Sequence, residues 1–141
     1  MVDLPKANHR QGLLVRALAV WCVLIAVEFI HGTLRTIFLV PVVGDFRSRQ
    51  IGVFTGSVLI LAVAYVLVPW LQANGKRALV LVGILWLVLT VTFEFSFGHF
   101  VFGRSWEGVA SDYNIFQGGL LPFGLLVLTF SPVIAARIRG E

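Results

Sequence analysis

Four long apolar stretches, separated by short polar segments, dominate the chain. A helix that crosses the hydrocarbon core of a bilayer needs about 20 mostly apolar residues. Stretches of this kind cover residues 12–31, 51–71, 78–98 and 115–136. The pattern predicts an all-α integral membrane protein whose four transmembrane helices form a single domain over residues 1–141.

Polar and aromatic residues recur in the same order in the two halves of the chain. The matched pairs are Trp21 and Trp86, Glu28 and Glu94, Phe29 and Phe95, Asp45 and Asp112, Phe46 and Tyr113, Gln50 and Gln117, and Gly52 and Gly119. Such recurrence indicates an internal repeat of two helical hairpins, 12–71 and 78–136. Both hairpins begin on the same side, so the repeat is parallel, with an axis along the membrane normal. Matched residues are then expected to face one another at equal depth.

Composition supports the membrane class. Hydrophobic residues make up 58% of the chain and charged residues only 13%, whereas soluble domains carry about 25% charged residues. The net charge of +4 does not indicate a nucleic-acid partner, because the cations flank the apolar stretches. The single cysteine, Cys22, excludes a disulfide framework within the chain and a cysteine-rich metal site.

The distribution of cations predicts the topology. Four spans place both termini and the polar turn 72–77 on one side, together with Lys6, Arg10, Arg16, Lys76, Arg77, Arg137 and Arg139. The other side holds Arg35, Arg47, Arg49 and Arg104. By the positive-inside rule, we expect a multi-pass protein of a bacterial-type inner (plasma) membrane with cytoplasmic N- and C-termini. The first apolar stretch is interpreted as a retained helix rather than a cleaved signal.

The two outer connections differ in character. Residues 36–44 are apolar but too short to span, and Pro41 prevents a regular helix from continuing through them. They are interpreted as an interfacial or re-entrant segment over the outer end of the bundle. Residues 103–114 occupy the equivalent place in the second half and are more polar.

Two glutamates, Glu28 and Glu94, lie within predicted spans. A carboxylate in a transmembrane segment is costly and usually faces the protein interior. One interpretation is a proton or cation site. The other is structural, with each glutamate paired to an arginine, for which Arg35 and Arg104 are the candidates.

A histidine follows each glutamate, but at unequal spacing. Glu28 and His31 are about 60° apart on a helix and can point inward together, whereas Glu94 and His99 are about 140° apart. A bulge at Gly98 would bring the second pair onto one face.

The spacing of these groups bears on cofactors. A di-iron site takes four carboxylates and two Glu-x-x-His motifs, and the chain has one such motif. Two histidines on facing helices could instead bind a haem b. No cofactor is predicted, and haem b is the alternative.

The second matched layer lies where the outer connections turn into helices. Asp45 and Asp112, with Gln50 and Gln117, are interpreted as caps of the helix starts. Gly52-x-x-x-Gly56 fits the small-residue pattern of close transmembrane packing.

These polar residues together form the predicted ligand-binding set: Glu28, His31, Arg35, Asp45, Gln50, Glu94, His99, Arg104, Asp112 and Gln117. The sequence favours a small inner-membrane protein whose polar outer-leaflet pocket binds or passes a small solute or ion. Membrane lipid and either a homo-oligomer or a partner membrane subunit are the expected partners. One alternative is an accessory or anchor subunit of a larger membrane complex that holds haem or quinone. Another is a membrane enzyme with the glutamates and histidines as acid–base groups, although the chain has no phosphate loop, nucleophile elbow or H-E-x-x-H motif.

Overall fold

A computed structural model describes residues 5–73, 75–101, 103–111, 113–115 and 119–140. Within these ranges the chain is helical and contains no strand. The helices are α1 (Pro5–Leu34), α2 (Val40–Val43), α3 (Asp45–Leu71), α4 (Gly75–Ser96), α5 (Trp106–Ser111) and α6 (Leu121–Ile138). Two π-helical turns, Arg35–Leu39 and Phe97–Val101, follow α1 and α4.

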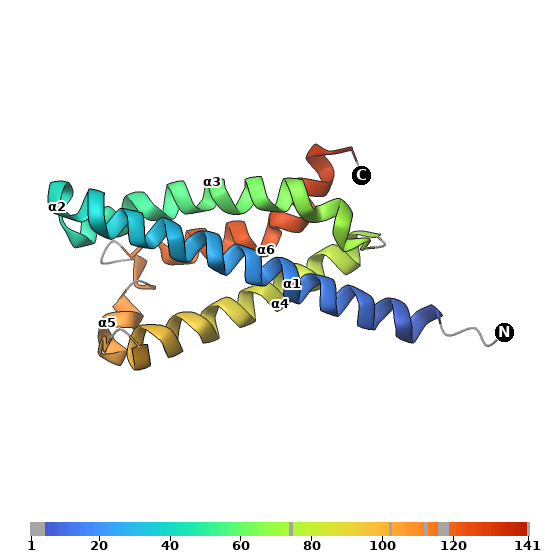
Figure 1. Cartoon of the computed structure of the whole chain (residues 1–141), viewed down its shortest axis with the longest axis horizontal. Helices are drawn as coiled ribbons and strands as arrows, with labels where there is room; N and C mark the ends of the chain where they lie inside the picture. The colour runs from blue at the N-terminus through green and yellow to red at the C-terminus, as the bar shows by residue number, and fades with distance from the viewer. Residues whose placement is uncertain (1–4, 74, 102, 112, 116–118, 141) are drawn as a thin grey trace.

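The long helices α1, α3, α4 and α6 run alternately up and down, so that α1 starts and α6 finishes at the same end of the bundle (Figure 1). We call this the terminal end, and the opposite end, which holds α2 and α5, the loop end. Four helical segments are long and apolar enough to cross a membrane: Gln11–Val43, Asp45–Leu71, Gly75–Val101 and Leu121–Ile138. The predicted all-α, four-span, multi-pass architecture is confirmed.

The first span is longer than the sequence pattern indicates. The chain does not leave the helix after residue 34, and the predicted separate segment over 36–44 is wrong. The wider turn at Arg35–Leu39, in which the Val40 N–H donates to the Arg35 carbonyl, leads into the short helix α2. Pro41 lies at the start of α2, where its missing N–H and rigid ring are tolerated. The helix finally ends at Gly44, whose φ of 88° suits glycine.

The helix that follows α4 contains the bulge expected at Gly98. The π-helical turn spans Phe97–Val101 and includes both Gly98 and His99. A Cβ added to Gly98 would come within 2.8 Å of the Val109 side chain, and Val109 is buried. Glycine at this position therefore allows α5 to pack against the end of the span.

Helix α6 packs most extensively against α3 and α4. Gly83 of α4 lies directly against the backbone of α6, so that a Cβ there would collide with the Thr129 carbonyl oxygen. The core around this contact contains Ala64, Trp86 and Ala135, all of which are essentially inaccessible. The sequence pattern did not single out Gly83.

Helices α1 and α4 are joined by two tryptophans. The Trp86 indole Nε1 donates to the Ala17 carbonyl at 2.9 Å, and the Trp21 indole Nε1 donates to Thr90 Oγ1 at 3.0 Å. These indoles therefore pack between α1 and α4.

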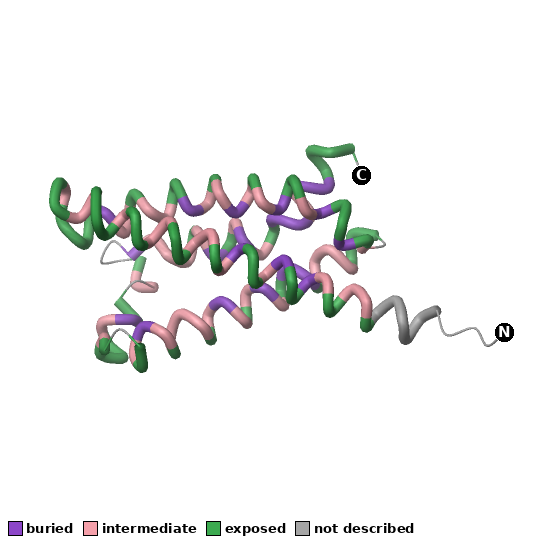
Figure 2. Tube along the Cα trace, in the orientation of Figure 1, coloured by how far each residue is buried: buried purple, intermediate pink, exposed green. Residues whose placement is uncertain are grey.

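Large apolar side chains cover the outside of the bundle, and exposed positions recur along the outward faces of the helices (Figure 2). Phe54, Val66, Val88 and Leu126 are each more than half exposed. In a soluble protein such a surface would aggregate; in a bilayer it contacts acyl chains.

Candidate polar cavity at the loop end

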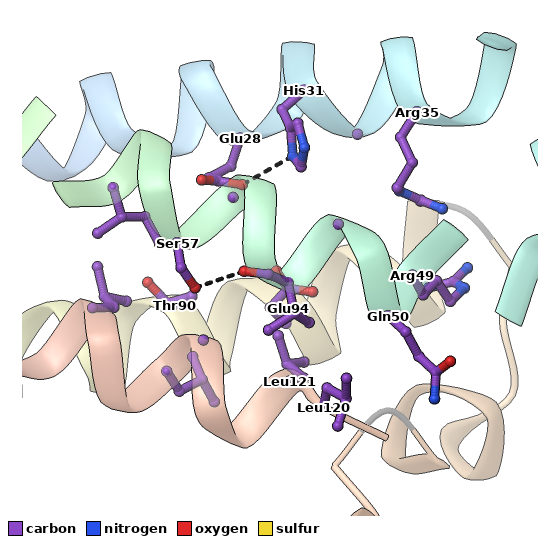
Figure 3. A pocket seen from close by; sticks show the side chains of 18 of the residues that line it. Glu28, His31, Arg35, Arg49, Gln50, Ser57, Thr90, Glu94, Leu120 and Leu121 are labelled. Carbon is purple, nitrogen blue, oxygen red and sulfur yellow. Dashed lines mark hydrogen bonds and ion pairs between the residues drawn. The ribbon is translucent and has the colours of Figure 1, made fainter. Parts of the chain in front are cut away.

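A cavity of about 210 Å³ opens between α1, α3, α4 and the start of α6. We call it the polar cavity (Figure 3). It is lined by Leu24, Ile25, Glu28, His31, Gly32, Arg35, Phe46, Arg49, Gln50, Gly52, Val53, Gly56, Ser57, Ile60, Thr90, Glu94, Gly119, Leu120, Leu121, Gly124, Leu125 and Leu128. Five residues of the predicted binding set therefore come together: Glu28, His31, Arg35, Gln50 and Glu94.

Glu28 projects from α1 towards α3. Its Oε2 lies 3.4 Å from His31 Nδ1. Its Oε1 is buried and has no hydrogen-bond partner among the described residues. Gly56 makes room for the carboxylate, because a Cβ at position 56 would lie 2.9 Å from Oε2. A buried carboxylate oxygen without a donor is unfavourable unless a proton, cation or ligand satisfies it.

His31 connects Glu28 to α3. Its Nε2 lies 2.6 Å from Thr55 Oγ1, so both ring nitrogens have partners. The pair with Glu28 is compatible with a carboxylate and an imidazolium, or with a neutral acid that donates to Nδ1. The two states differ by the position of one proton between Glu28 and His31.

Arg35 is held at the start of α3 rather than against Glu28. Its Nη1 donates to Ser48 Oγ at 2.6 Å, and Ser48 Oγ donates to the Asp45 carbonyl at 2.9 Å. Ser48 is fully buried, which fixes this connection. The predicted pairing of Glu28 with Arg35 is therefore wrong, since the ion-pair partner of Glu28 is His31.

Glu94 enters the cavity from α4, with Thr90 one turn before it. The Ser57 side chain of α3 points towards it (Figure 3). Glu28 lines the same cavity from α1. The cavity thus gathers two acidic side chains at its deeper part.

Positive charge lies nearer to the loop end. Arg49 and Gln50 line the cavity there, as does Arg35, and in Figure 3 all three lie on the loop side of the glutamates. Acidic and basic side chains are therefore segregated along the cavity.

Glycines 52 and 56 have a different role from the one predicted. A Cβ on Gly52 would lie 2.9 Å from Arg35 Cδ and 3.8 Å from His31 Cε1. Together with Gly56, it forms a groove on α3 that receives the polar side chains of α1. The Gly52-x-x-x-Gly56 pattern predicts close helix packing. In the structure, the space beside these two glycines accommodates polar side chains of α1.

Asp45 lies outside the cavity lining. It is the first residue of α3, Gly44 is the N-cap, and no side-chain capping bond is formed. The Asp45 carboxylate instead accepts a hydrogen bond from Arg49 Nε at 2.9 Å. Asp45 therefore makes no side-chain cap, because Gly44 takes the N-cap position. Its negative charge does lie in the first turn of α3, at the positive end of the helix.

His99 and Arg104 are also directed away from the cavity. The His99 ring stacks on Trp106 with centroids 3.8 Å apart, and His99 Nδ1 lies 2.8 Å from the Arg104 carbonyl oxygen. Arg104 Nη2 donates to the Gly108 carbonyl at 2.7 Å. The π-helical turn therefore directs His99 to the α5 connection and not to the glutamates. Among the described residues, His31 lines the cavity and His99 does not, so the two histidines are not brought together to hold a haem.

Asp112 and Gln117 lie outside the described residues. Within the described ranges, no group of three histidine, cysteine or acidic side chains is arranged to hold a metal ion.

Sequence reasoning missed Arg49, Thr55, Ser57 and Thr90. Helical spacing could have found three of these. Thr90 lies four residues before Glu94, and Ser57 lies seven after Gln50, so each shares a face with a predicted residue. Arg49 lies one turn after Asp45.

No known protein family, curated protein or solved structure matches this chain. The geometry of the polar cavity is thus the main guide to its function.

Proposed function

We propose that this protein is a small inner-membrane protein whose polar cavity binds or passes a small cation, or a small solute that carries a cationic group, in the outer leaflet. The single observation that supports this most strongly is the buried Glu28 Oε1, which has no hydrogen-bond partner among the described residues. Glu94 lines the same cavity. Two carboxylates at membrane depth are stabilised by a positive charge placed between them.

The size and charge order of the cavity limit the ligand further. Its volume of about 210 Å³ is below the roughly 300–1,000 Å³ that is typical of pockets for drug-sized ligands. A compact ion or an alkylammonium group therefore suits it better than a large substrate. Arg35 and Arg49 near the loop end would accommodate a polar or anionic end of a zwitterion.

The orientation and assembly are part of the same proposal. The positive-inside rule favours cytoplasmic termini, which would make the loop end the outer one. We propose that the chain acts as a homo-oligomer, with native mass spectrometry as the check.

The proposal is tested by ligand-induced stabilisation. A ligand that binds only the folded state raises the midpoint of unfolding. The purified protein in detergent is titrated with methylammonium, tetramethylammonium and potassium chlorides at constant ionic strength. N-methyl-D-glucamine chloride serves as the bulky control. We expect at least one compact cation to raise the midpoint and the bulky cation to leave it unchanged. If none of the three compact cations shifts the midpoint, a structural subunit of a larger complex becomes the better interpretation.

A further inference from the structure

A second cavity, of about 270 Å³, lies at the terminal end of the bundle, where α3 ends, α4 begins and α6 approaches its end. We call it the basic cavity. Its polar wall includes Gln72, Lys76 and Arg137, and its apolar wall includes Val68, Leu79 and Val133. This site is separate from the polar cavity and shares no lining residue with it.

A tight reversal of the chain creates this cavity. Pro69 lies in the last turn of α3, where it removes one backbone donor, and Gln72 follows with a left-handed φ of 55°. Gly75, with a φ of 87°, begins α4. The end of α3 and the first turn of α4 are consequently adjacent, and Lys76 of α4 and Arg137 of α6 line the same cavity.

The cations in this cavity have no partner among the residues that the structure describes. Lys76 and Arg137 are exposed and make no hydrogen bond or ion pair with any described side chain. Arg139, by contrast, donates to the Tyr65 carbonyl at 3.0 Å and lies 4.7 Å above the Tyr65 ring. Arg139 is thus already engaged, whereas Lys76 and Arg137 are available to a ligand.

The surrounding charge favours an anion. The acidic residues that the structure describes are Glu28, Asp45, Glu94 and Glu107, and all belong to the loop-end half of their helices or to α5. The described part of the terminal end therefore carries cations without neighbouring carboxylates. The first turn of α4 adds the partial positive charge of a helix start.

We propose that the basic cavity binds the phosphate group of an anionic phospholipid. A soluble anion would use only Lys76 and Arg137. A lipid would in addition place its acyl chains along the apolar wall and the outward surface of the bundle. Trp70, which is half exposed beside Pro69, is placed as interfacial tryptophans are, at the level of the headgroups. Basic pockets between transmembrane helices bind lipid headgroups in this way.

The test measures lipid binding to the full chain by native mass spectrometry, with added phosphatidylglycerol or phosphatidylcholine of identical acyl chains. We expect phosphatidylglycerol to bind more tightly, and the double variant Lys76→Gln/Arg137→Gln to lose roughly 30-fold in affinity for it, at about fivefold for each cation. Arg77→Gln is the matched control, because Arg77 is exposed in the same turn of α4 but does not line the cavity. It should keep nearly wild-type binding.

A charge-conserving variant and a competition experiment distinguish lipid binding from misfolding and from binding of a soluble phosphate. The variant Lys76→Arg/Arg137→Lys keeps both charges and should retain binding, which controls for folding. Equal binding of the two lipids, or an equal loss in Arg77→Gln, would overturn the proposal. So would competition by sn-glycerol 3-phosphate at the concentration of the lipid, since that would identify a soluble phosphate as the ligand.

Discussion

Gly56 of α3 lies against the carboxylate of Glu28 on α1, so that a Cβ at position 56 would come within 2.9 Å of Oε2 and 3.4 Å of Oε1. The absence of a side chain on α3 thus allows a charged group from α1 to reach the polar cavity. The shape of the polar cavity therefore depends on the glycine at position 56.

Gly56→Ala should therefore displace the Glu28 carboxylate. The added methyl group leaves no room for the present rotamer, but the atoms that it meets are the end of a flexible side chain that can move. We expect a weaker cation response with little change in the free energy of unfolding, measured by thermal unfolding with and without methylammonium. An unchanged cation response would mean that Gly56 does not shape the site.

Gly83→Ala should be one of the most damaging small substitutions in the chain. The new Cβ would collide with the Thr129 backbone carbonyl, and α4 and α6 would have to separate. We expect a loss of about 3 kcal/mol or more, at the upper end of overpacking effects, measured by chemical unfolding in detergent.

Gly32→Ala is the matched control for the stability of both glycine variants, because no atom lies within 4 Å of its added Cβ. Alanine in a helix is favoured over glycine by about 1 kcal/mol, so this variant should be neutral or slightly stabilising. A Gly32→Ala variant as unstable as Gly83→Ala would contradict the described packing.

Trp86→Phe should lower stability more than Trp70→Phe. Trp86 is fully buried and donates to Ala17 across the α1–α4 interface, whereas Trp70 is 48% exposed. Loss of the hydrogen bond and of buried volume should lower the free energy of unfolding by about 1–3 kcal/mol in Trp86→Phe. The loss in Trp70→Phe should be at most about 0.5 kcal/mol. Equal costs would argue against the tight α1–α4 contact.

The proposed topology is tested with reporter fusions. A reporter placed after Glu141 or between residues 74 and 76 should be cytoplasmic, and one near Ser48 or Ser111 should be periplasmic. The reason is that the terminal end carries more cations than the loop end. The reverse pattern would place the polar cavity in the cytoplasmic leaflet.

Much of the fold could be predicted from the sequence because lipid imposes a simple rule of length and polarity on each span. The four spanning helices follow from that rule. The path of residues 36–44 could not be predicted in the same way. Pro41 can end a helix or can follow a π-helical turn, and the choice depends on backbone geometry that the hydropathy pattern does not contain. The duplication of the two hairpins stays a prediction.

The candidate site was predictable only in part. Glu28, His31, Arg35, Gln50 and Glu94 share the cavity because polar groups in a membrane converge on the interior. His99 was expected to join them once Gly98 bulged. The bulge is present, but the stacking of His99 on Trp106 depends on the position of α5, which no spacing rule provides.

The measurement that tests the central claim most directly compares the cation response of Glu28→Gln and Glu94→Gln with that of Glu107→Gln. Glu107 is exposed on α5 and does not line the cavity, so it controls for net charge. We predict that the first two variants stay folded without ligand and are at least as stable as the wild type, because neutralising one of two half-buried carboxylates in the same cavity lowers its desolvation cost and any repulsion between them. Their methylammonium-induced rise in unfolding midpoint should be abolished, while Glu107→Gln keeps it. A wild-type rise in both Glu28→Gln and Glu94→Gln would contradict the account and assign the glutamates a purely structural role.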